Sequence, residues 1–437
     1  MEVYATSNKS QPNMSHKVFS SSEIGQLKRV IVHRPDEGIS RISPKRAEDL
    51  LFDDIVYLPQ MQTEHDIFTD VLKAFLGPDN VLETQQLIRE ALEADEESKM
   101  ETIDKIVDYE ELPSYFKEKL ASLSNAELAK VLINGYYAPE DYILFDPIPN
   151  FIFTRDIAVT INDHVVITKA AKEARFRENF LTRFIFLAHP IFRQLQEENR
   201  VINMNKVDLF PPSKRGEAIS MEGGDMMIIN SDYLLIGCSE RTNAHSIQAL
   251  AKVLFEKGVV ENVVQVNIPV DRSFMHIDTI FTQINHHHIV GYKPIIIDGL
   301  SSYVNVYNIK GVTRHYPSVR DFWMGEIDSK VEFILSGNGD SPYQEREQWT
   351  DGCNLVVMKP GVALTYDRNP KTEVALRNAG YSILSAYDLL KGVKKGEIDP
   401  QKLENTIVTL PSNELSRARG GSHCMTCPIE RFTVAKV

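Results

Sequence analysis

The stretch DIAVTINDHVVIT (Asp156–Thr168) carries the pattern from which we predict the fold. An apolar run, a short polar turn and a second apolar run follow one another, as they do in a β-hairpin. The same pattern, again opening with an aspartate, recurs in Asp225–Gly237, Asp278–Gly291 and Asp351–Tyr366. Helix-like segments lie between these hairpins, and KRVIVHRP (Lys28–Pro35) could begin a fifth unit. Repeats of this size indicate a propeller-like or pseudo-symmetric α/β array, with an ordinary mixed α/β sheet as the open alternative.

The region from about Glu64 to Gly135 differs from the hairpin units. It is acidic and rich in helix formers, and Glu83–Val107 has helical periodicity with a charged face. Ser124 and Glu127 have the spacing of a capping box, which marks the start of a helix. We therefore predict a helical insertion or small bundle whose charged runs form a solvated face.

The composition is that of a globular protein, with 437 residues of which 43% are hydrophobic and 25% charged. A net charge of −13 argues against a nucleic-acid partner, because phosphates need a basic surface. No apolar run approaches the ~20 residues that span a membrane. The start, MEVYATSNKSQPNMSH, lacks the basic and apolar regions of a secretion signal. Four cysteines do not suggest a disulfide framework, so we expect a cytoplasmic protein with reduced thiols.

The segment RARGGSHCMTCPIER (Arg417–Arg431) holds the strongest candidate for chemistry. Its Gly-Gly pair gives the backbone freedom to turn sharply. A cysteine after such a turn, Cys424, can stand on an exposed loop as a thiolate nucleophile. Cys424 and Cys427 also form C-x-x-C, but structural zinc needs a second close pair, and Cys238 and Cys353 stand far apart. A redox motif is disfavoured because the pair does not open an early βαβ unit.

The motif MHID offers a first partner for the cysteine. On a strand, His276 and Asp278 would point to the same side and could face one ligand. A histidine titrates near neutrality and can shuttle protons. A structural His–Asp pair is the alternative. The run His286–His288 falls in a hairpin turn and is interpreted as solvated rather than metal-binding.

Two further motifs contribute carboxylates. In MEGGD, the two glycines let the backbone approach another group closely, although Glu222 and Asp225 could instead stabilise a turn. In FTRD, Arg155 and Asp156 could form a simple ion pair. Each motif taken alone leaves its structural alternative open.

Taken together, these residues favour one site. They lie at the starts of the repeating hairpins or on the glycine turn, and such positions converge on one centre in a pseudo-symmetric array. A group of carboxylates beside one cysteine and one histidine suits a planar cation, because guanidinium pairs bidentately with carboxylates. Two aspartates could hold the outer nitrogens and aim the central carbon at the sulfur.

In their order along the chain, these motifs resemble those of the arginine deiminases, members of the guanidine-modifying (pentein) superfamily. The resemblance covers nearly the whole chain. It is carried by KRVIVHRP, DLLFDD (Asp49–Asp54), PNFIFTRD (Pro149–Asp156), MEGGD, CSERT (Cys238–Thr242), MHIDT (Met275–Thr279) and RGGSHCMTCPI (Arg419–Ile429). It implies an α/β fold, a five-bladed pseudo-symmetric ββαβ propeller with an inserted α-helical domain. The expected division is residues 1–63 for the start of the propeller, 64–140 for the helical domain and 141–437 for the remainder of the propeller.

The resemblance also implies a role for each matching residue. The implied catalytic set is Cys424 as nucleophile, His276 as general acid and base, Asp156 and Asp278 as guanidinium clamps, and Glu222 as the carboxylate beside the histidine. The implied substrate-binding set is Arg175 (or Arg177) and Arg241 on the α-carboxylate, Asn150 and Phe153 in the pocket, and Arg419 and Leu51 on mobile loops. Two residues depart from the family pattern: Ile157 follows FTRD where a proline or small residue is frequent, and Ser422 replaces a glycine.

The reaction implied is the hydrolysis of L-arginine to L-citrulline and ammonia through a covalent S-alkylthiouronium on Cys424. The resemblance implies no cofactor and no metal, and it implies a homo-oligomer. Another guanidine-modifying hydrolase or an amidinotransferase is the alternative enzyme, although Arg175 and Arg241 disfavour agmatine, which has no carboxylate. A non-catalytic arginine-binding protein is the alternative of another class.

Overall fold

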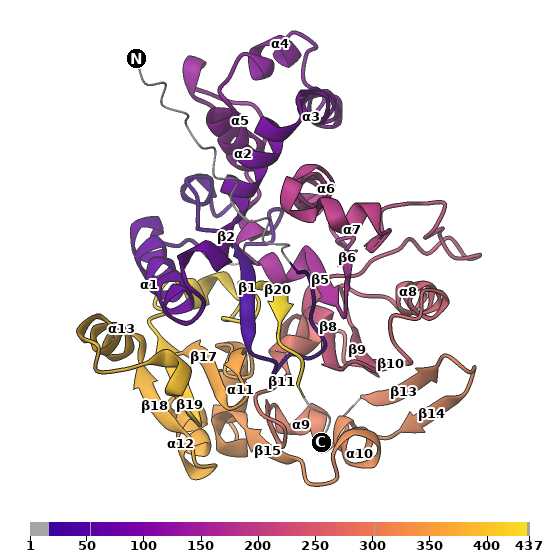
Figure 1. Cartoon of the computed structure of the whole chain (residues 1–437), viewed down its shortest axis with the longest axis vertical. Coiled ribbons are helices and arrows are strands. Elements are labelled where there is room, and N and C mark those ends of the chain that lie inside the picture. The colour runs from indigo at the N-terminus through magenta and orange to yellow at the C-terminus, as the bar shows by residue number, and fades with distance from the viewer. Residues whose placement is uncertain (1–16, 53, 301, 435–437) are drawn as a thin grey trace, which may run out of the picture.

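The computed structural model describes residues 17–52, 54–300 and 302–434 (Figure 1). The strands of these residues form six sheets, and helices occupy the connections between them. Residues 1–16, which the sequence predicts to hold no secretion signal, and Asp53 of the DLLFDD motif lie outside the described residues.

Four sheets share one plan. Two antiparallel strands are joined by a short turn, and a third strand runs parallel to the second. The strands are β5 (Ala158–Ile161), β6 (His164–Ile167) and β7 (Val201–Asn203); β8 (Met226–Asn230), β9 (Tyr233–Cys238) and β10 (Asn262–Asn267); β11 (Phe281–Gln283), β12 (His288–Gly291) and β15 (Glu332–Leu335); and β16 (Val356–Lys359), β17 (Val362–Tyr366) and β19 (Thr406–Leu410). The antiparallel pairs confirm the four hairpins predicted from the sequence.

Five further strands extend this plan or stand apart from it. In the second sheet β13 and β14 continue outward from β10, and in the fourth β18 pairs with β19. The remaining pair, β3 and β4, forms a small sheet by itself. Their bounds are β13 (Tyr303–Asn308), β14 (Thr313–Tyr316), β18 (Ser382–Ser385), β3 (Tyr136–Tyr137) and β4 (Tyr142–Ile143).

A further sheet, of three strands, joins segments near the two ends of the described residues. Here β1 (Leu27–Val32) pairs antiparallel with β20 (Cys427–Arg431) and parallel with β2 (Val81–Glu83). The strands β1 and β20 lie side by side near the centre of Figure 1. KRVIVHRP thus contributes a strand to a further sheet, as expected, and this sheet also holds the strand that begins three residues after Cys424.

Helices cover the parallel connections, because two parallel strands cannot be joined by a tight turn. The crossing helices are α1 (Leu58–Leu76), α6 (Phe176–Ala188), α7 (Arg193–Glu197), α8 (Ala244–Glu256), α9 (Lys293–Ile296), α10 (Val319–Phe322), α12 (Pro370–Asn378) and α13 (Ala386–Lys395), while α11 (Tyr343–Trp349) connects two sheets. Two of these helices are followed by a glycine of positive φ: Gly258 (φ 65°) follows α8 and Gly380 (φ 91°) follows α12. Glycine tolerates this left-handed conformation better than other residues.

A group of four helices lies away from the sheets, at the top of Figure 1. They are α2 (Thr84–Ala94), α3 (Glu96–Tyr109), α4 (Phe116–Ala121) and α5 (Asn125–Asn134), and their apolar faces share one core with α6. The capping box of Ser124 and Glu127 is present at the start of α5. The periodic stretch Glu83–Val107 is broken at Asp95, whose extended backbone ends α2 and whose side chain caps α3. In contrast, α1 packs against α13 and β19, beside the fourth sheet.

Among the helices of the described residues, we find none with both the length and the apolar character that a membrane span requires.

Candidate active site

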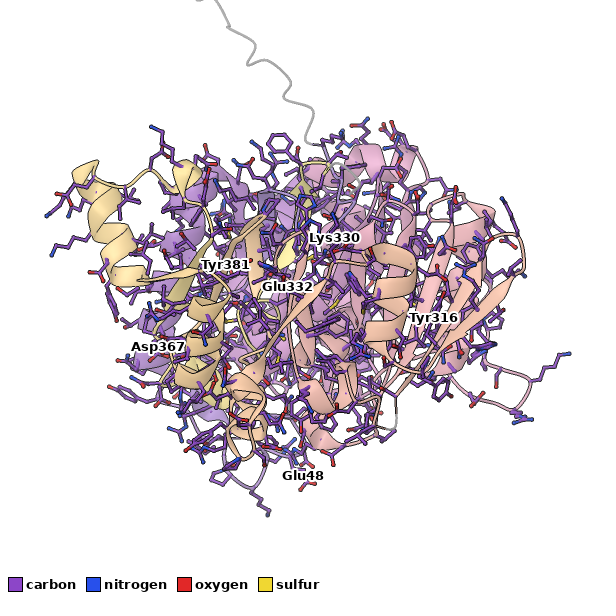
Figure 2. The ribbon with its side chains drawn as sticks, turned by 90° about the horizontal axis from the view of Figure 1, so that it is seen from below. Glu48, Tyr316, Lys330, Glu332, Asp367 and Tyr381 are labelled. Carbon is purple, nitrogen blue, oxygen red and sulfur yellow. The ribbon has the colours of Figure 1, made fainter. Side chains whose placement is uncertain are left out.

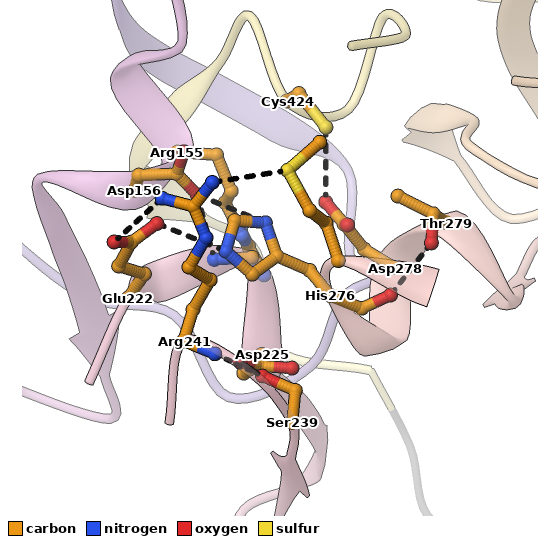
Figure 3. Close-up of polar contacts among 12 residues, drawn as sticks. Arg155, Asp156, Glu222, Asp225, Ser239, Arg241, His276, Asp278, Thr279 and Cys424 are labelled. Atoms are coloured by element: carbon orange, nitrogen blue, oxygen red, sulfur yellow. Dashed lines mark hydrogen bonds and ion pairs between the residues drawn. The ribbon is translucent and has the colours of Figure 1, made fainter. Parts of the chain in front are cut away.

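The candidate residues come from short turns that precede the first strand of successive sheets. Asp156 ends a 3-10 turn before β5, Glu222 precedes the turn Gly223–Asp225 before β8, and His276 and Asp278 flank and occupy the turn before β11. Cys424 lies just before β20. The repeated placement of these turns brings the five side chains to one centre, as predicted (Figure 3).

The local backbone around His276 differs from the prediction. His276 is not on a strand; it is extended and caps the 3-10 turn Ile277–Thr279, which contains Asp278. The two side chains still reach one site, because the turn directs Asp278 at the sulfur and His276 at the carboxylates of Asp156 and Glu222. The outcome expected from strand alternation therefore arises from a different geometry.

The glycines of MEGGD allow the close approach that the sequence predicts. The Gly224 N–H donates to Asp156 Oδ1 at 3.0 Å. A Cβ atom at Gly224 would lie 2.5 Å from His276 Nδ1, and one at Gly223 would lie 2.0 Å from the Arg155 carbonyl oxygen. Any side chain at either position would therefore push the histidine or the FTRD turn away from the site.

The glycines of the cysteine loop serve a different purpose from the predicted one. The left-handed residue of the loop is Arg419 (φ 60°), which precedes them. A Cβ at Gly420 would lie 2.2 Å from the Phe153 ring and one at Gly421 would lie 2.5 Å from Asn354 Oδ1, so both glycines permit close packing. The expectation of an exposed cysteine is also wrong, because Cys424 is only 4% exposed.

The Cys424 sulfur contacts one carboxylate and one amide. Sγ lies 3.3 Å from Asp278 Oδ2 and 3.1 Å from Asn354 Nδ2. Burial, followed by the negative charges of Asp278 and Asp156, raises the pKa of this thiol well above its usual range. The sulfur of the empty site is therefore a thiol, and a cation between the two aspartates would favour its ionisation.

His276 lies among carboxylates. Its Nε2 is 3.0 Å from Glu222 Oε2, and its Nδ1 is 3.6 Å from Asp156 Oδ1. Burial alone would lower the pKa of the imidazole, but Asp156 and the hydrogen bond to Glu222 outweigh it and raise the pKa to about 10. The histidine of the empty site is thus a cation that can donate a proton.

Arg175 lies directly among the same carboxylates. Its Nη1 is 2.7 Å from Asp156 Oδ2 and 2.9 Å from Glu222 Oε2, while its Nε donates to Glu178 at 2.8 Å. The alternative residue, Arg177, lies elsewhere and donates to Glu110 and to the backbone of the helical group. Of the two arginines, the structure therefore places Arg175 in the site.

A pocket of about 310 Å³ opens beside these residues. Ten of the eleven residues predicted for the site line it: Leu51, Asn150, Phe153, Asp156, Arg175, Glu222, Arg241, His276, Arg419 and Cys424. The eleventh, Asp278, lies behind the sulfur that it contacts. Glu48, an exposed residue that also lines the pocket, lies at the lower edge of the view in Figure 2.

The ion pair suggested for FTRD does not form. Arg155 turns away from Asp156, and its guanidinium donates to Glu23 and, at 2.8 Å, to the Met226 carbonyl oxygen. The backbone N–H of Arg155 donates to the Cys424 carbonyl oxygen at 3.0 Å. Arg155 thus holds the cysteine loop through its backbone, and its guanidinium does not pair with the Asp156 carboxylate, which contacts Arg175 and the Gly224 N–H instead.

Several residues that contact the site were missed by the sequence analysis. Asn354 contacts the sulfur, and its Oδ1 accepts from the N–H groups of both His423 and Cys424. His423 Nδ1 is 2.9 Å from Asp278 Oδ2, and the Arg419 guanidinium lies 3.3 Å above the Trp349 ring centroid. A single sequence gives no signal for these residues, because each acquires its role only through folding.

Three side chains of the site are of the types that bind metal ions. Asp156, Glu222 and His276 offer ligand atoms within 4.8 Å of one another, and they could in principle hold an ion. In this structure the Arg175 guanidinium pairs with the carboxylates of both Asp156 and Glu222. The site therefore already holds a cation, and that cation is a guanidinium group. Cys427, the second cysteine of C-x-x-C, instead contacts the Ala158 carbonyl oxygen at 3.2 Å.

The fold and the site define a mixed α/β protein with a buried cysteine, a cationic histidine and a cluster of carboxylates suited to a guanidinium group. The sequence model of the arginine deiminase family matches residues 48–139 and 129–431. The chain is 33% identical to arginine deiminases from Bacillus thuringiensis and Listeria monocytogenes, across 96% of this chain and 98–99% of those proteins. It belongs to the arginine deiminase family.

Two solved structures also align with most of this chain. A DDAH from Pseudomonas aeruginosa complexed with citrulline aligns with a TM-score of 0.48 and 13% identity, covering 93% of this chain and all of that one. The N-terminal domain of the cyanobacterial arginine dihydrolase ArgZ aligns with a TM-score of 0.49 and 14% identity, covering 92% and 97% of the two chains.

Proposed function

We propose that this protein is a hydrolase that converts L-arginine to L-citrulline and ammonia. Membership of the arginine deiminase family supports this activity. The single structural observation that carries it is the distribution of charge in the pocket. Carboxylates line the pocket beside the cysteine. The remaining lining carries both acidic and basic side chains.

That distribution matches each end of L-arginine. The side-chain guanidinium can pair with Asp156 and Glu222 beside the cysteine, because carboxylates bind it bidentately. Arg175 and Arg241 can take the α-carboxylate, and Glu240 on the wall can accept from the α-ammonium. Asn150 and Phe153 would enclose the aliphatic chain, and Leu51 and Arg419 would cover the pocket.

The chemistry begins at Cys424. A bound guanidinium places positive charge between Asp156 and Asp278, which lowers the cost of ionising the thiol and holds the central carbon against the sulfur. The thiol proton leaves to solvent through Asp278, the hydrogen-bond partner of Sγ, and the thiolate attacks this carbon and forms a C–S bond. His276 donates its proton to the departing nitrogen, and ammonia leaves as the C–N bond breaks. The product of this step is an S-alkylthiouronium on Cys424.

The second half of the reaction uses the same residues in reverse. His276, now neutral, accepts a proton from water as the water attacks the thiouronium carbon. The C–S bond breaks, the hydroxyl proton of the adduct passes to the departing sulfur and restores the thiol, and citrulline is released with its new C=O group. Glu222 keeps the imidazole oriented throughout, since it holds Nε2 at 3.0 Å.

The finer fold assignment is part of the proposal. The repeated three-stranded sheets and the pairing of β1 with β20 support a five-bladed pseudo-symmetric ββαβ propeller, and the shared core of α2–α5 supports an inserted helical domain. The expected divisions 1–63, 64–140 and 141–437 need one change, because the boundary at residue 64 falls inside α1, which packs beside the fourth sheet, and because β2 pairs with β1. We therefore propose that the helical domain comprises α2–α5. A homo-oligomer and a cytoplasmic location stay predictions, which sedimentation and cell fractionation would test.

Mass spectrometry of the protein quenched during turnover of L-arginine tests the mechanism. We expect an adduct on the peptide of Cys424 and an unmodified Cys427, which lies in the same peptide region and serves as an internal control. Cys424→Ala should form no citrulline, while Cys238→Ser should retain activity. Citrulline formation by Cys424→Ala at the wild-type rate would disprove the covalent route.

A substrate panel separates this activity from its alternatives. Dimethylarginine hydrolysis, agmatine deimination or amidino transfer would each give a different preferred substrate or product. We expect ammonia release to be fastest with L-arginine, because the pocket offers cations for a carboxylate. A preference for agmatine would contradict the assignment of Arg175 and Arg241.

A further inference from the structure

Arg175 already occupies the place of a guanidinium ligand. Its Nη1 donates to Asp156 Oδ2 at 2.7 Å and to Glu222 Oε2 at 2.9 Å. These carboxylates are the same ones that face His276 and line the pocket beside Cys424. An arginine of the protein thus makes the contacts that the guanidinium of a bound arginine would need.

The other edge of the Arg175 guanidinium is held by a third carboxylate. Nε and Nη2 each lie 2.8 Å from Glu178 Oε2, one turn along the chain. The side chains of Arg175 and Glu178 are 5% and 1% exposed, and Glu178 Oε1 has no other hydrogen-bond partner. Because Glu178 is not among the residues that line the pocket, it can keep hold of the arginine when Nη1 leaves Asp156 and Glu222.

Two guanidinium groups cannot use Asp156 Oδ2 and Glu222 Oε2 at once. We propose that Arg175 is an internal guanidinium that fills the cation subsite of the empty pocket, that Glu178 anchors it, and that ligand binding exchanges one guanidinium for the other. This inference rests on the proposed function, because it assumes that the incoming ligand carries a guanidinium.

The exchange makes the α-carboxylate a determinant of specificity. When the ligand displaces Nη1 of Arg175, that nitrogen loses two buried anions, and an unpaired buried charge is costly. A ligand with a carboxylate supplies a replacement anion, whereas a plain guanidinium compound does not. The apparent affinity of the second kind of ligand is therefore its intrinsic affinity multiplied by the fraction of protein in which Arg175 has already left Asp156 and Glu222.

Binding of methylguanidine tests the exchange, because this probe has the cation and lacks the carboxylate. We would measure binding by calorimetry in Cys424→Ala, which prevents turnover, with and without Arg175→Met. Removing the internal guanidinium should tighten methylguanidine binding by about tenfold or more, since each lost charge-assisted contact is worth at least that factor. L-Arginine should gain less, because it also loses its carboxylate partner.

The outcomes separate this inference from simpler ones. If Arg175 only binds the carboxylate, Arg175→Met leaves methylguanidine affinity unchanged; if it only supports the fold, both ligands bind more weakly. Either result would overturn the exchange. Methylguanidine binding without any binding of L-arginine would instead disprove the proposed substrate and leave the exchange standing.

A second pair of variants guards against misfolding of Arg175→Met. Arg175→Lys keeps the positive charge, but one ammonium cannot bridge all three carboxylates, so methylguanidine should again bind more tightly. Glu178→Gln should raise KM for L-arginine several-fold with kcat retained, and Glu178→Asp should restore part of that loss. A fall in kcat at constant KM would show that Glu178 does not act by positioning Arg175.

Discussion

At the residue scale, the reactivity of Cys424 depends on the charges around its sulfur. Asp278 accepts from the thiol at 3.3 Å, and the buried negative charge of Asp278 and Asp156 opposes ionisation. The same aspartates favour a cation beside the sulfur, so the thiolate forms when the ligand arrives. If Cys424 is the nucleophile proposed above, its protonated form is less reactive toward oxidants, because the thiolate is the reactive form.

Asn354 offers a test of how the sulfur is positioned. It donates to Sγ at 3.1 Å and to the Asp278 carbonyl oxygen at 3.1 Å, and it is fully buried. We expect Asn354→Ala to lower kcat about tenfold to a hundredfold with little change in KM, in line with the loss of one to two buried hydrogen bonds. Steady-state citrulline assays would measure this, with the partly exposed Asn285→Ala as control. An equal loss in both variants would contradict a specific role.

His276 gives a pH-dependent stability prediction. Its pKa in the folded protein is raised from the ordinary value of 6.5 to about 10, so folding favours the protonated imidazole. The resulting stabilisation is fully present below about pH 6.5 and is lost as the pH rises toward 10. We therefore expect the difference in unfolding free energy between wild type and His276→Gln to shrink across this range.

Urea unfolding at pH 6, 8 and 10 would measure that difference. The exposed His315→Gln should show no such trend and serves as a control for the pH dependence of the whole protein. A difference between wild type and His276→Gln that grows with pH would mean that the histidine is neutral in the folded state.

At the element scale, helix α1 holds the loop that leads to the cysteine. Glu64 is fully buried on α1, and its Oε2 accepts from the N–H groups of Glu414 and Leu415 at 2.9 and 3.0 Å. These residues begin the segment that contains Arg419 and Cys424. The order of the active-site loop thus depends on a helix more than 350 residues earlier in the chain.

Glu64→Ala should therefore destabilise the protein by about 1–3 kcal/mol, because two buried N–H groups lose their acceptor. Guanidinium unfolding would measure this. Asp70→Ala is a matched control on the same helix, since its side chain is 57% exposed and its pair with Lys73 is a surface ion pair of little value. Similar losses in both variants would show that the contact of Glu64 with the loop is unimportant.

The elements that the sequence predicts well are those with local signals. Alternating apolar residues and a turn define β5 and β6 without help from distant residues, and the capping box of Ser124 and Glu127 acts within one helical turn. The third strand of each sheet is harder to predict, because its parallel pairing depends on a crossover of many residues. The break at Asp95 also escaped prediction, since helical periodicity continues across it.

The site was predictable to the extent that its residues belong to motifs. The family resemblance and the hairpin starts together identified Cys424, His276 and the carboxylates, and the structure brings them together. The position of Arg175 was not predictable, because its partners Asp156, Glu222 and Glu178 come from three separate segments. The contacts of Asn354 with Cys424 and of His423 with Asp278 were not predicted either, because the partners come from separate segments of the chain.

At the scale of the whole molecule, Glu23 joins four parts of the chain. Its carboxylate pairs with Arg155 of the FTRD turn, accepts from the Ile228 N–H of β8, and lies 3.5 Å from His423 in the cysteine loop. Burial alone would raise the pKa of Glu23, but Arg155 and His423 outweigh it and hold the pKa far below its usual value. Glu23 is therefore charged, and its neighbours depend on that charge.

Glu23→Gln should destabilise the protein by about 3–5 kcal/mol, because it leaves the Arg155 guanidinium buried without a counter-charge. The double variant Glu23→Gln/Arg155→Met removes both charges and should recover part of the loss, since a buried ion pair is worth little against an apolar replacement. Urea unfolding of the wild type, Glu23→Gln, Arg155→Met and the double variant measures these losses, with Glu430→Gln as a control within about 0.5 kcal/mol, because its pair with Arg29 is long and partly exposed. Full additivity of the two single losses would show that Glu23 and Arg155 do not act as a pair, and that the connection between the chain's beginning and its cysteine loop depends on other contacts.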